Sequence, residues 1–170
     1  MNMNKHMANA QKSIANNISV KIANTKEDVL AAQKLRYEVF YEEYDAKPSP
    51  EMEKEKRDID ELDSYADHLI VTDTTDGQNK VVGTYRLLRQ DIAKKYGSFY
   101  TSSEFNITPL TNLDHNLLEL GRSCVLADYR TRPVLQLLWQ GISEYMIEHE
   151  IGMLFGCASL HGTNIDDLSE

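Results

Sequence analysis

Residues 117–126 of the chain read Leu-Leu-Glu-Leu-Gly-Arg-Ser-Cys-Val-Leu, a largely apolar run that predicts a strand carrying two charged side chains. A turn follows, and Pro133, a favoured first residue of a helix, starts a second element that continues to about His149. Gly152 is expected to end this helix, and residues 153–160 predict the next strand. The rest of the fold is arranged around this strand, helix and strand.

Towards the N-terminus the chain alternates between strands and a single long helix. Residues 18–23 alternate apolar and polar like a half-buried strand, and a helix is expected to begin near Lys26. Residues 68–72 and 80–88 are apolar runs on either side of turn-forming residues, which predicts a β-hairpin. The order of elements is therefore typical of a mixed α/β domain.

Three segments fall outside these elements. Residues 45–66 contain two prolines, many charges and few apolar side chains, which predicts an irregular loop that serves a site. Residues 1–17 are expected to form a flexible leader, and residues 18–170 a single domain. Near Asn164 a further helix starts and is not finished, so the domain is expected to be incomplete at its C-terminus.

Composition narrows the class of protein. The chain has 170 residues and a formal net charge of −9, which argues against nucleic-acid binding because phosphate contact needs a dense Lys/Arg surface. No apolar run approaches the roughly 20 residues that cross a bilayer, so a cytoplasmic location is expected. Cys124 and Cys157 lie in expected strands and are interpreted as buried thiols, and Trp139 as a core residue.

Five segments, read together, carry a family resemblance. They are LRYEVF at 35–40, DIDELD at 58–63, VGTYRLL at 82–88, LELGRS at 118–123 and FGCAS at 155–159. The combination resembles the ornithine N-acyltransferases of bacterial ornithine lipid biosynthesis, which belong to the GNAT acyltransferase superfamily and are similar in turn to the acyl-homoserine-lactone synthases.

The resemblance implies a GNAT-like α/β fold, a mixed sheet flanked by helices in which strands 117–126 and 153–160 splay apart. The cleft between them would hold the phosphopantetheine arm of acyl carrier protein, with no tightly bound cofactor. The implied reaction moves a 3-hydroxyacyl group from this carrier to the α-amino group of ornithine and gives a lyso-ornithine lipid. Such a product would allow a peripheral contact with the inner face of the membrane.

The resemblance also assigns roles to residues. Glu119 would orient or deprotonate the amine, and Arg122 and Arg86 would complete the catalytic site. Arg36 and Phe40 would contribute to substrate binding. Glu119 and Arg122 could instead form an ordinary exposed ion pair on a strand surface. Arg36 and Arg86 could instead lie at the edge of a helix or strand and extend their charged groups into solvent.

The acidic loop supplies the expected partners of a cationic acceptor. By the same resemblance Asp60 and Asp63 would bind the side-chain amine of ornithine. Their spacing from Asp58 faintly suggests a calcium loop, but the sixth and twelfth positions of such a loop would be Asp63 and Leu69 instead of glycine and glutamate. Metal binding is therefore not expected.

The start of the second long helix bears on the acyl donor. Acetyl-CoA-dependent relatives place a glycine-rich loop there, whereas residues 129–134 contain no glycine and Pro133 removes an amide donor. Arg130 and Arg132 would instead hold the single phosphate of a carrier-bound pantetheine. This pattern favours acyl carrier protein over CoA.

A conflict in periodicity predicts a local irregularity. Side chains three apart on a regular strand point to opposite faces, so Glu119 and Arg122 share one cleft only if an extra residue is inserted into the pairing. Gly121 lies between them and favours a β-bulge between Leu120 and Ser123.

Two other functions stay open at this point. One is an acyl-homoserine-lactone-synthase-like enzyme that uses S-adenosylmethionine as the amine. The other is a non-catalytic truncated remnant, or one half of a split acyltransferase.

Overall fold

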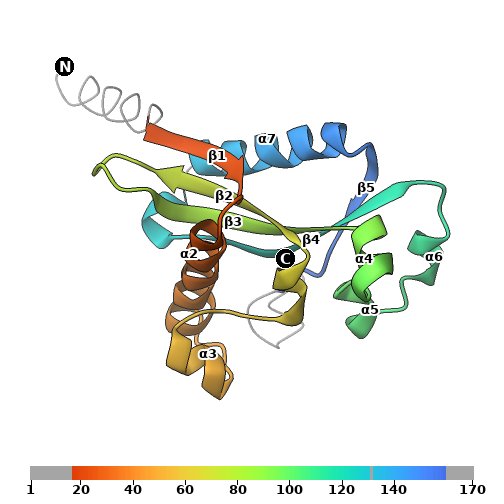
Figure 1. Cartoon of the computed structure of the whole chain (residues 1–170), viewed down its shortest axis with the longest axis horizontal. Helices are drawn as coiled ribbons and strands as arrows, with labels where there is room; N and C mark the ends of the chain where they lie inside the picture. Colours follow the sequence, from red (N-terminus) through yellow and green to blue (C-terminus); the bar gives the residue numbers. More distant parts are fainter. Residues whose placement is uncertain (1–16, 131, 160–170) are drawn as a thin grey trace, which may run out of the picture.

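A computed structural model of the chain describes residues 17–130 and 132–159, except for the side chain of Arg132. Five strands form one sheet in the order β1-β2-β3-β4-β5 (Figure 1). Neighbouring strands from β1 to β4 are antiparallel, and β4 and β5 are parallel. The strands are β1 (Ile18–Ile22), β2 (Asp67–Asp73), β3 (Lys80–Arg89), β4 (Asn116–Val125) and β5 (Ile151–Phe155).

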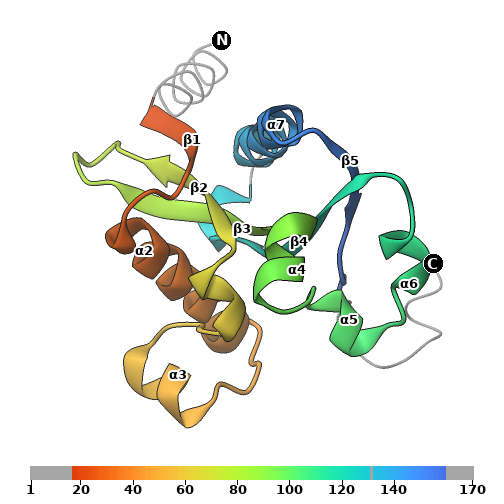
Figure 2. The same ribbon diagram turned by 45° about the vertical axis from the view of Figure 1, so that its right-hand side comes forward.

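The two long helices cover opposite faces of this sheet, α2 below it and α7 above it in Figures 1 and 2. Shorter helices gather where β3 ends and β4 begins, and α3 lies beyond α2. The helices are α2 (Lys26–Tyr37), α3 (Pro50–Glu55), α4 (Gln90–Tyr96), α5 (Thr101–Glu104), α6 (Thr108–Thr111) and α7 (Arg132–Glu148). The predicted mixed sheet flanked by helices is confirmed.

Capping and apolar spacing explain α2. The Thr25 hydroxyl accepts a hydrogen bond from the backbone N–H of Asp28 at 3.1 Å, which satisfies one of the free donors at the helix start. A π-helical turn, Glu38–Glu43, continues the helix. Leu35 and Val39, one turn apart, are buried in the main core.

Helix α7 packs closely against one face of the sheet. Val134, Leu138 and Ile142 recur at helical spacing and are buried. A Cβ on Gly141 would lie 2.7 Å from a methyl carbon of Leu69. The absence of a side chain there lets α7 pack directly on the sheet.

The predicted hairpin is confirmed in β2 and β3, which pair in antiparallel register around a turn in which Gly77 has a φ of 73°. The segment expected to be an irregular loop, 45–66, is partly helical. It contains α3, whose start is capped by the Ser49 hydroxyl, and a 3-10 turn at Glu61–Ser64. A second 3-10 turn, Ala127–Tyr129, connects β4 to α7.

Other expectations were wrong in their boundaries or burial. Gly152 lies inside β5, and the turn after α7 passes instead through Glu150 in the left-handed region, with a φ of 52°. The last strand ends at Phe155, so Cys157 lies beyond it and is exposed. Trp139 is 46% exposed, because it stands one residue off the buried stripe of α7. The expectations for residues 1–16 and 160–170 lie outside the described residues.

Among the described residues, no helix combines the length and apolar character that crossing a membrane requires.

Candidate active site

β4 and β5 separate about halfway along β4. Their parallel pairing runs from Asn116 with Ile151 to Glu119 with Phe155, whereas β4 continues to Val125. Gly156 marks the fork, because a Cβ there would collide with the backbone oxygen of Leu120. The splayed strands that the resemblance implies are therefore present, and Glu119 is the last residue of β4 that pairs with β5.

A cleft of about 980 Å³ opens at this fork. Its volume lies at the upper end of the range for small-molecule sites. Residues 119–123 of β4 and 154–159 at the end of the described chain form two of its walls. Aromatic side chains from several elements complete the lining, namely Phe40, Tyr41, Tyr44, Tyr85, Tyr100, Phe105, Trp139 and Phe155.

The bulge predicted in β4 is confirmed. Arg86 pairs with Gly121 and Thr84 with Cys124, so the two residues between them on β4 oppose one residue of β3. Arg122, and not Gly121, takes the left-handed backbone, with a φ of 49°. A non-glycine residue in this region is strained by about 1–3 kcal/mol and persists where its surroundings hold it.

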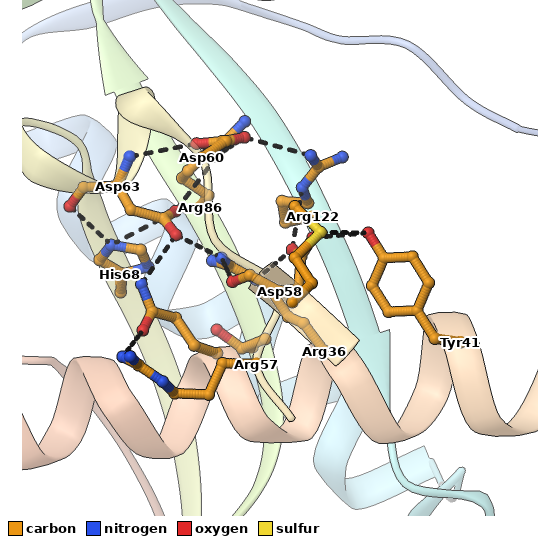
Figure 3. A network of polar contacts seen from close by, with 12 residues as sticks. Arg36, Tyr41, Arg57, Asp58, Asp60, Asp63, His68, Arg86 and Arg122 are labelled. Atoms are coloured by element: carbon orange, nitrogen blue, oxygen red, sulfur yellow. Dashed lines mark hydrogen bonds and ion pairs between the residues drawn. The ribbon is translucent and has the colours of Figure 1, made fainter. Parts of the chain in front are cut away.

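Ion pairs hold Arg122 in that conformation. Its Nε lies 3.1 Å from Asp58 Oδ2, and its Nη2 donates to Asp60 Oδ2 at 3.1 Å (Figure 3). Arg86 on β3 donates to both oxygens of Asp60, at 2.6 and 2.5 Å. The bulge thus turns Arg122 to the same side of the sheet as Arg86, where one carboxylate binds both.

Arg36 completes this network. It comes from α2, whereas Arg86 and Arg122 come from the sheet, and it is fully buried. Its Nη2 donates to Asp63 Oδ2 at 2.5 Å, and its Nε lies 2.7 Å from Asp58 Oδ2. Three arginines and three aspartates therefore alternate, as Figure 3 shows, and their formal charges cancel. We call these six residues the arginine–aspartate network: Arg36, Asp58, Asp60, Asp63, Arg86 and Arg122.

The surroundings of the network shift the pKa values of Asp63, Tyr41 and His68. Burial works to raise the pKa of Asp63, but the hydrogen bond and charge of Arg36, with help from Gln33 and Arg86, outweigh it and lower that pKa to about 2. Tyr41 donates to Asp58 Oδ1 at 2.9 Å, and burial together with this carboxylate raises the pKa of Tyr41 to about 12. Burial lowers the pKa of His68, so its ring is neutral near pH 7.

The predicted catalytic arginines and substrate-binding residues lie at different depths. Phe40, Arg86 and Arg122 line the cleft, and the Arg122 side chain is 27% exposed. Arg36, Asp60 and Asp63 are not part of that lining, and each already binds residues of the network. A cationic substrate would have to compete with those arginines for either carboxylate.

Sequence reasoning missed Asp58 and Tyr41. Asp58 is fully buried and touches both Arg36 and Arg122. Its place at the head of the acidic DIDELD segment was visible, but nothing in the sequence separated it from the two aspartates that follow. Tyr41 directly follows the LRYEVF segment and contributes its hydroxyl to the same carboxylate.

Glu119 is 4% exposed and lines the cleft at the fork. The backbone N–H of Tyr100 donates to its Oε2 at 2.8 Å. The backbone N–H and the hydroxyl of Thr101 both donate to its Oε1, at 2.6 and 2.5 Å. An exposed pair with Arg122, the alternative interpretation of the sequence, is not what the structure has.

At the start of α7, Arg130 is bound to another side chain. Both of its terminal nitrogens donate to the carboxylate of Glu43 at 2.6 Å, and its Nε donates to the backbone oxygen of Val125. Arg132 is the first residue of α7, and its side chain lies outside the description. Within residues 17–130 and 132–159, no group of three or more His, Cys, Asp or Glu side chains is placed to hold a metal ion.

Comparison with known sequences identifies relatives over most of the chain. An L-ornithine N(alpha)-acyltransferase of Rhizobium meliloti is 46% identical over 151 residues, which are 86% of this chain and 51% of that protein. Proteins of the same name from Brucella abortus and Rhodobacter capsulatus are 42% and 41% identical, over 53% and 60% of their lengths. The chain thus spans about half the length of the curated relatives it matches.

Solved structures share the fold at low sequence identity. The acyl-homoserine-lactone (AHL) synthase LasI has a TM-score of 0.58 at 18% identity, with 82% of this chain and 71% of that chain covered. FeeM, an N-acyl amino acid synthase from uncultured soil microbes, has a TM-score of 0.53 at 12% identity, with 81% and 68% covered. Residues 35–140, which include the network and β4, match the acetyltransferase (GNAT) domain model, and the chain belongs to this family.

Proposed function

We propose that this chain carries the catalytic cleft of an N-acyltransferase that moves a 3-hydroxyacyl group from acyl carrier protein to the α-amino group of ornithine. The product would be a lyso-ornithine lipid, and such a product would bring the enzyme into peripheral contact with the membrane. The observation that carries the proposal is the buried Glu119 at the fork of β4 and β5, in a chain that is 41–46% identical to L-ornithine N(alpha)-acyltransferases.

The cleft suits attack by an amine on a thioester. The amine must be neutral to attack, and Glu119 is a buried carboxylate that lines the cleft at the fork. As the C–N bond forms and the C–S bond breaks, Glu119 takes the proton that the amine loses, and the thiolate of the donor leaves and is protonated in turn. The reaction needs no covalent intermediate on the protein and no metal.

An extended donor arm also fits the fork. Beyond Glu119, β4 continues without β5 beside it in register. A phosphopantetheine arm is long, thin and carries two amide groups, so it can lie along this part of the strand and place its thioester next to Glu119. The aromatic lining of the cleft offers an apolar surface to the acyl chain.

Carrier protein is preferred over CoA as the donor because residues 129–134 lack the glycines of a diphosphate-binding loop. Ornithine is preferred as the acceptor on the strength of the relatives' names. Asp60 and Asp63 keep their proposed role in recognising its side-chain amine only if the cation displaces part of the pairing with Arg86 and Arg36.

The decisive experiment uses the full protein, expressed from its natural reading frame, with 3-hydroxyacyl carrier protein and ornithine. We expect N-acylornithine as the product, identified by mass spectrometry, and a fall in kcat of about 100-fold in Glu119→Gln. Glu148→Gln, at an exposed position at the end of α7, is the matched control and should keep the wild-type rate.

Three outcomes would contradict the proposal in different ways. Equal rates with acyl-CoA would remove the donor assignment. Acylation of S-adenosylmethionine in place of ornithine would move the protein to the acyl-homoserine-lactone class. No transfer to either amine would favour a non-catalytic protein or half of a two-chain enzyme.

A further inference from the structure

The hydrogen bonds around Glu119 leave one acceptor position open. A carboxylate offers about four lone-pair sites, two on each oxygen. Oε1 receives two hydrogen bonds, both from Thr101, whereas Oε2 receives one, from the Tyr100 N–H. Oε1 is therefore saturated, and the position left for a further proton lies on Oε2.

We propose that Thr101 is a positioning residue for acyl transfer, which saturates Oε1 of Glu119 and so presents Oε2 to the amine in the cleft. This inference rests on the function proposed above and adds to it a second residue that acts through Glu119. Thr101 is itself 6% exposed and is not part of the cleft lining, so it acts without touching the substrate.

The direction of the Thr101 hydroxyl is set by its other neighbour. The thiol of Cys157, just beyond β5, donates to Thr101 Oγ1 at 3.5 Å. The hydroxyl oxygen accepts there and gives its own proton to Glu119. The end of β5 is thereby connected to Oε1 on β4, across the fork that forms the cleft.

The same segment is connected to the β-bulge. The guanidinium carbon of Arg122 lies 5.8 Å from the centroid of the Tyr100 ring, within the range of a cation–π contact. Tyr100 thus touches Arg122 with its ring and Glu119 with its backbone N–H. The two residues at the start of α5 therefore set the relative positions of Glu119 and Arg122.

The test compares Thr101→Val, which keeps the shape and removes the hydroxyl, with Thr101→Ser, which keeps the hydroxyl. Thr111→Val, whose hydroxyl donates to the backbone oxygen of Thr108 away from the cleft, is the matched control. We expect Thr101→Val to lower kcat about tenfold, with the KM for ornithine within about twofold of wild type. Thr101→Ser should recover kcat to within about threefold, and Thr111→Val should not change it.

A double-mutant cycle separates positioning from a structural role. Because Thr101 acts through Glu119, adding Thr101→Val to Glu119→Gln should change kcat less than about twofold further. If the double variant instead lost kcat by the product of the two single-variant factors, that result would overturn the inference. So would a Thr101→Val protein that unfolds at a lower temperature yet keeps the wild-type kcat per folded molecule. Thr101→Ala replaces the valine variant if that protein does not fold, with the same expected fall in kcat.

A measurement without catalysis keeps the inference separate from the proposed function. The backbone nitrogen of Thr101 lies 2.6 Å from Oε1 of Glu119. The proton on that nitrogen should resonate downfield in NMR spectra, and its resonance should move upfield in Glu119→Gln. If it does not move, the inference is wrong for any acyl acceptor. If it moves and wild type does not acylate ornithine, the proposed acceptor is wrong and the hydrogen bonds stand.

Discussion

At the scale of single residues, the site is built from charges that are each held by several partners. Arg36 is fully buried and binds Asp58 and Asp63. Burying a charge is unfavourable unless its partners replace the lost water, and breaking one such pair leaves the other charge uncompensated. Arg122 adds a strained backbone to this network. Removal of any one member should therefore affect the others.

Asp63→Asn tests this dependence. Asp63 has a folded pKa of about 2, below its usual 3.8, so its stabilisation is complete above about pH 4 and is lost as the pH falls towards 2. At pH 7 we expect the free energy of unfolding to fall by about 3 kcal/mol in the variant. The difference from wild type should shrink by about 2 kcal/mol between pH 4 and pH 2.

Urea unfolding at a series of pH values measures both quantities. The exposed Asp114 provides the control, because Asp114→Asn should leave the unfolding curves close to wild type. The idea fails if the difference in unfolding free energy between Asp63→Asn and wild type stays constant down to pH 2. Such a result would mean that Arg36 does not lower the pKa of Asp63 in the folded protein.

At the scale of elements, the fork between β4 and β5 depends on close backbone contact. Gly156 lies where the two strands part, and no side chain fits between it and the backbone of Leu120. Gly156→Ala should force the end of β5 away from β4, with a loss of about 2 kcal/mol of stability and a larger loss of activity. Urea unfolding and the acyl-transfer assay measure the two effects.

Gly121→Ala is the matched control, because a Cβ there would meet Arg86 at an ordinary 3.9 Å and Gly121 lines the same cleft. This variant should unfold like the wild type. Equal destabilisation by the two substitutions would show that space at the fork is not what requires glycine at position 156.

The long elements could be predicted from the sequence because their periodicity and caps are local. The hairpin and the order of strands and helices follow from such patterns. The bulge near Gly121 needed in addition the shared site that the resemblance assigned to Glu119 and Arg122. α4, α5 and α6 have only four to seven residues, too few to show a helical period. Trp139 could have been placed correctly, since it falls off the stripe formed by Val134, Leu138 and Ile142.

The site was harder to predict because its contacts join distant residues. The sequence identified Glu119 only through a resemblance, and nothing near it in the chain indicated that Thr101, 18 residues earlier, would bind it. Likewise the pairing of Asp60 with Arg122 joins residues 62 positions apart. The resemblance assigned Asp60 and Asp63 to a cation, and the sequence did not show that arginines from α2, β3 and β4 already hold them.

At the scale of the whole molecule, a formal net charge of −9 would repel an acidic carrier protein unless a basic patch receives it. Arg130, which was expected to hold the phosphate of the carrier, is a candidate for that patch, and it is paired with Glu43 on a partly exposed surface. This pair contributes little to stability, about 0–1 kcal/mol. It can therefore be changed to test docking without unfolding the protein.

Reversing Arg130 to glutamate should weaken carrier binding, and Glu43→Gln should strengthen it by releasing the guanidinium. We expect shifts in Kd of roughly threefold to tenfold at low salt that shrink as salt is added. Calorimetric titration with the carrier protein measures them. If both variants bind like the wild type, the carrier docks on another surface.

The cancellation of charge within the arginine–aspartate network has a consequence for how an acceptor arrives. Since the six residues sum to zero, the negative charge of the molecule is borne by the rest of the chain. A small cation in solution is then drawn by a field that acts over many ångströms and that dissolved ions screen, whereas the network beside the cleft adds no net charge to attract it. If the acceptor is ornithine, as we propose, ionic strength should therefore govern how often it is captured and leave the speed of its acylation, once captured, to the geometry around Glu119.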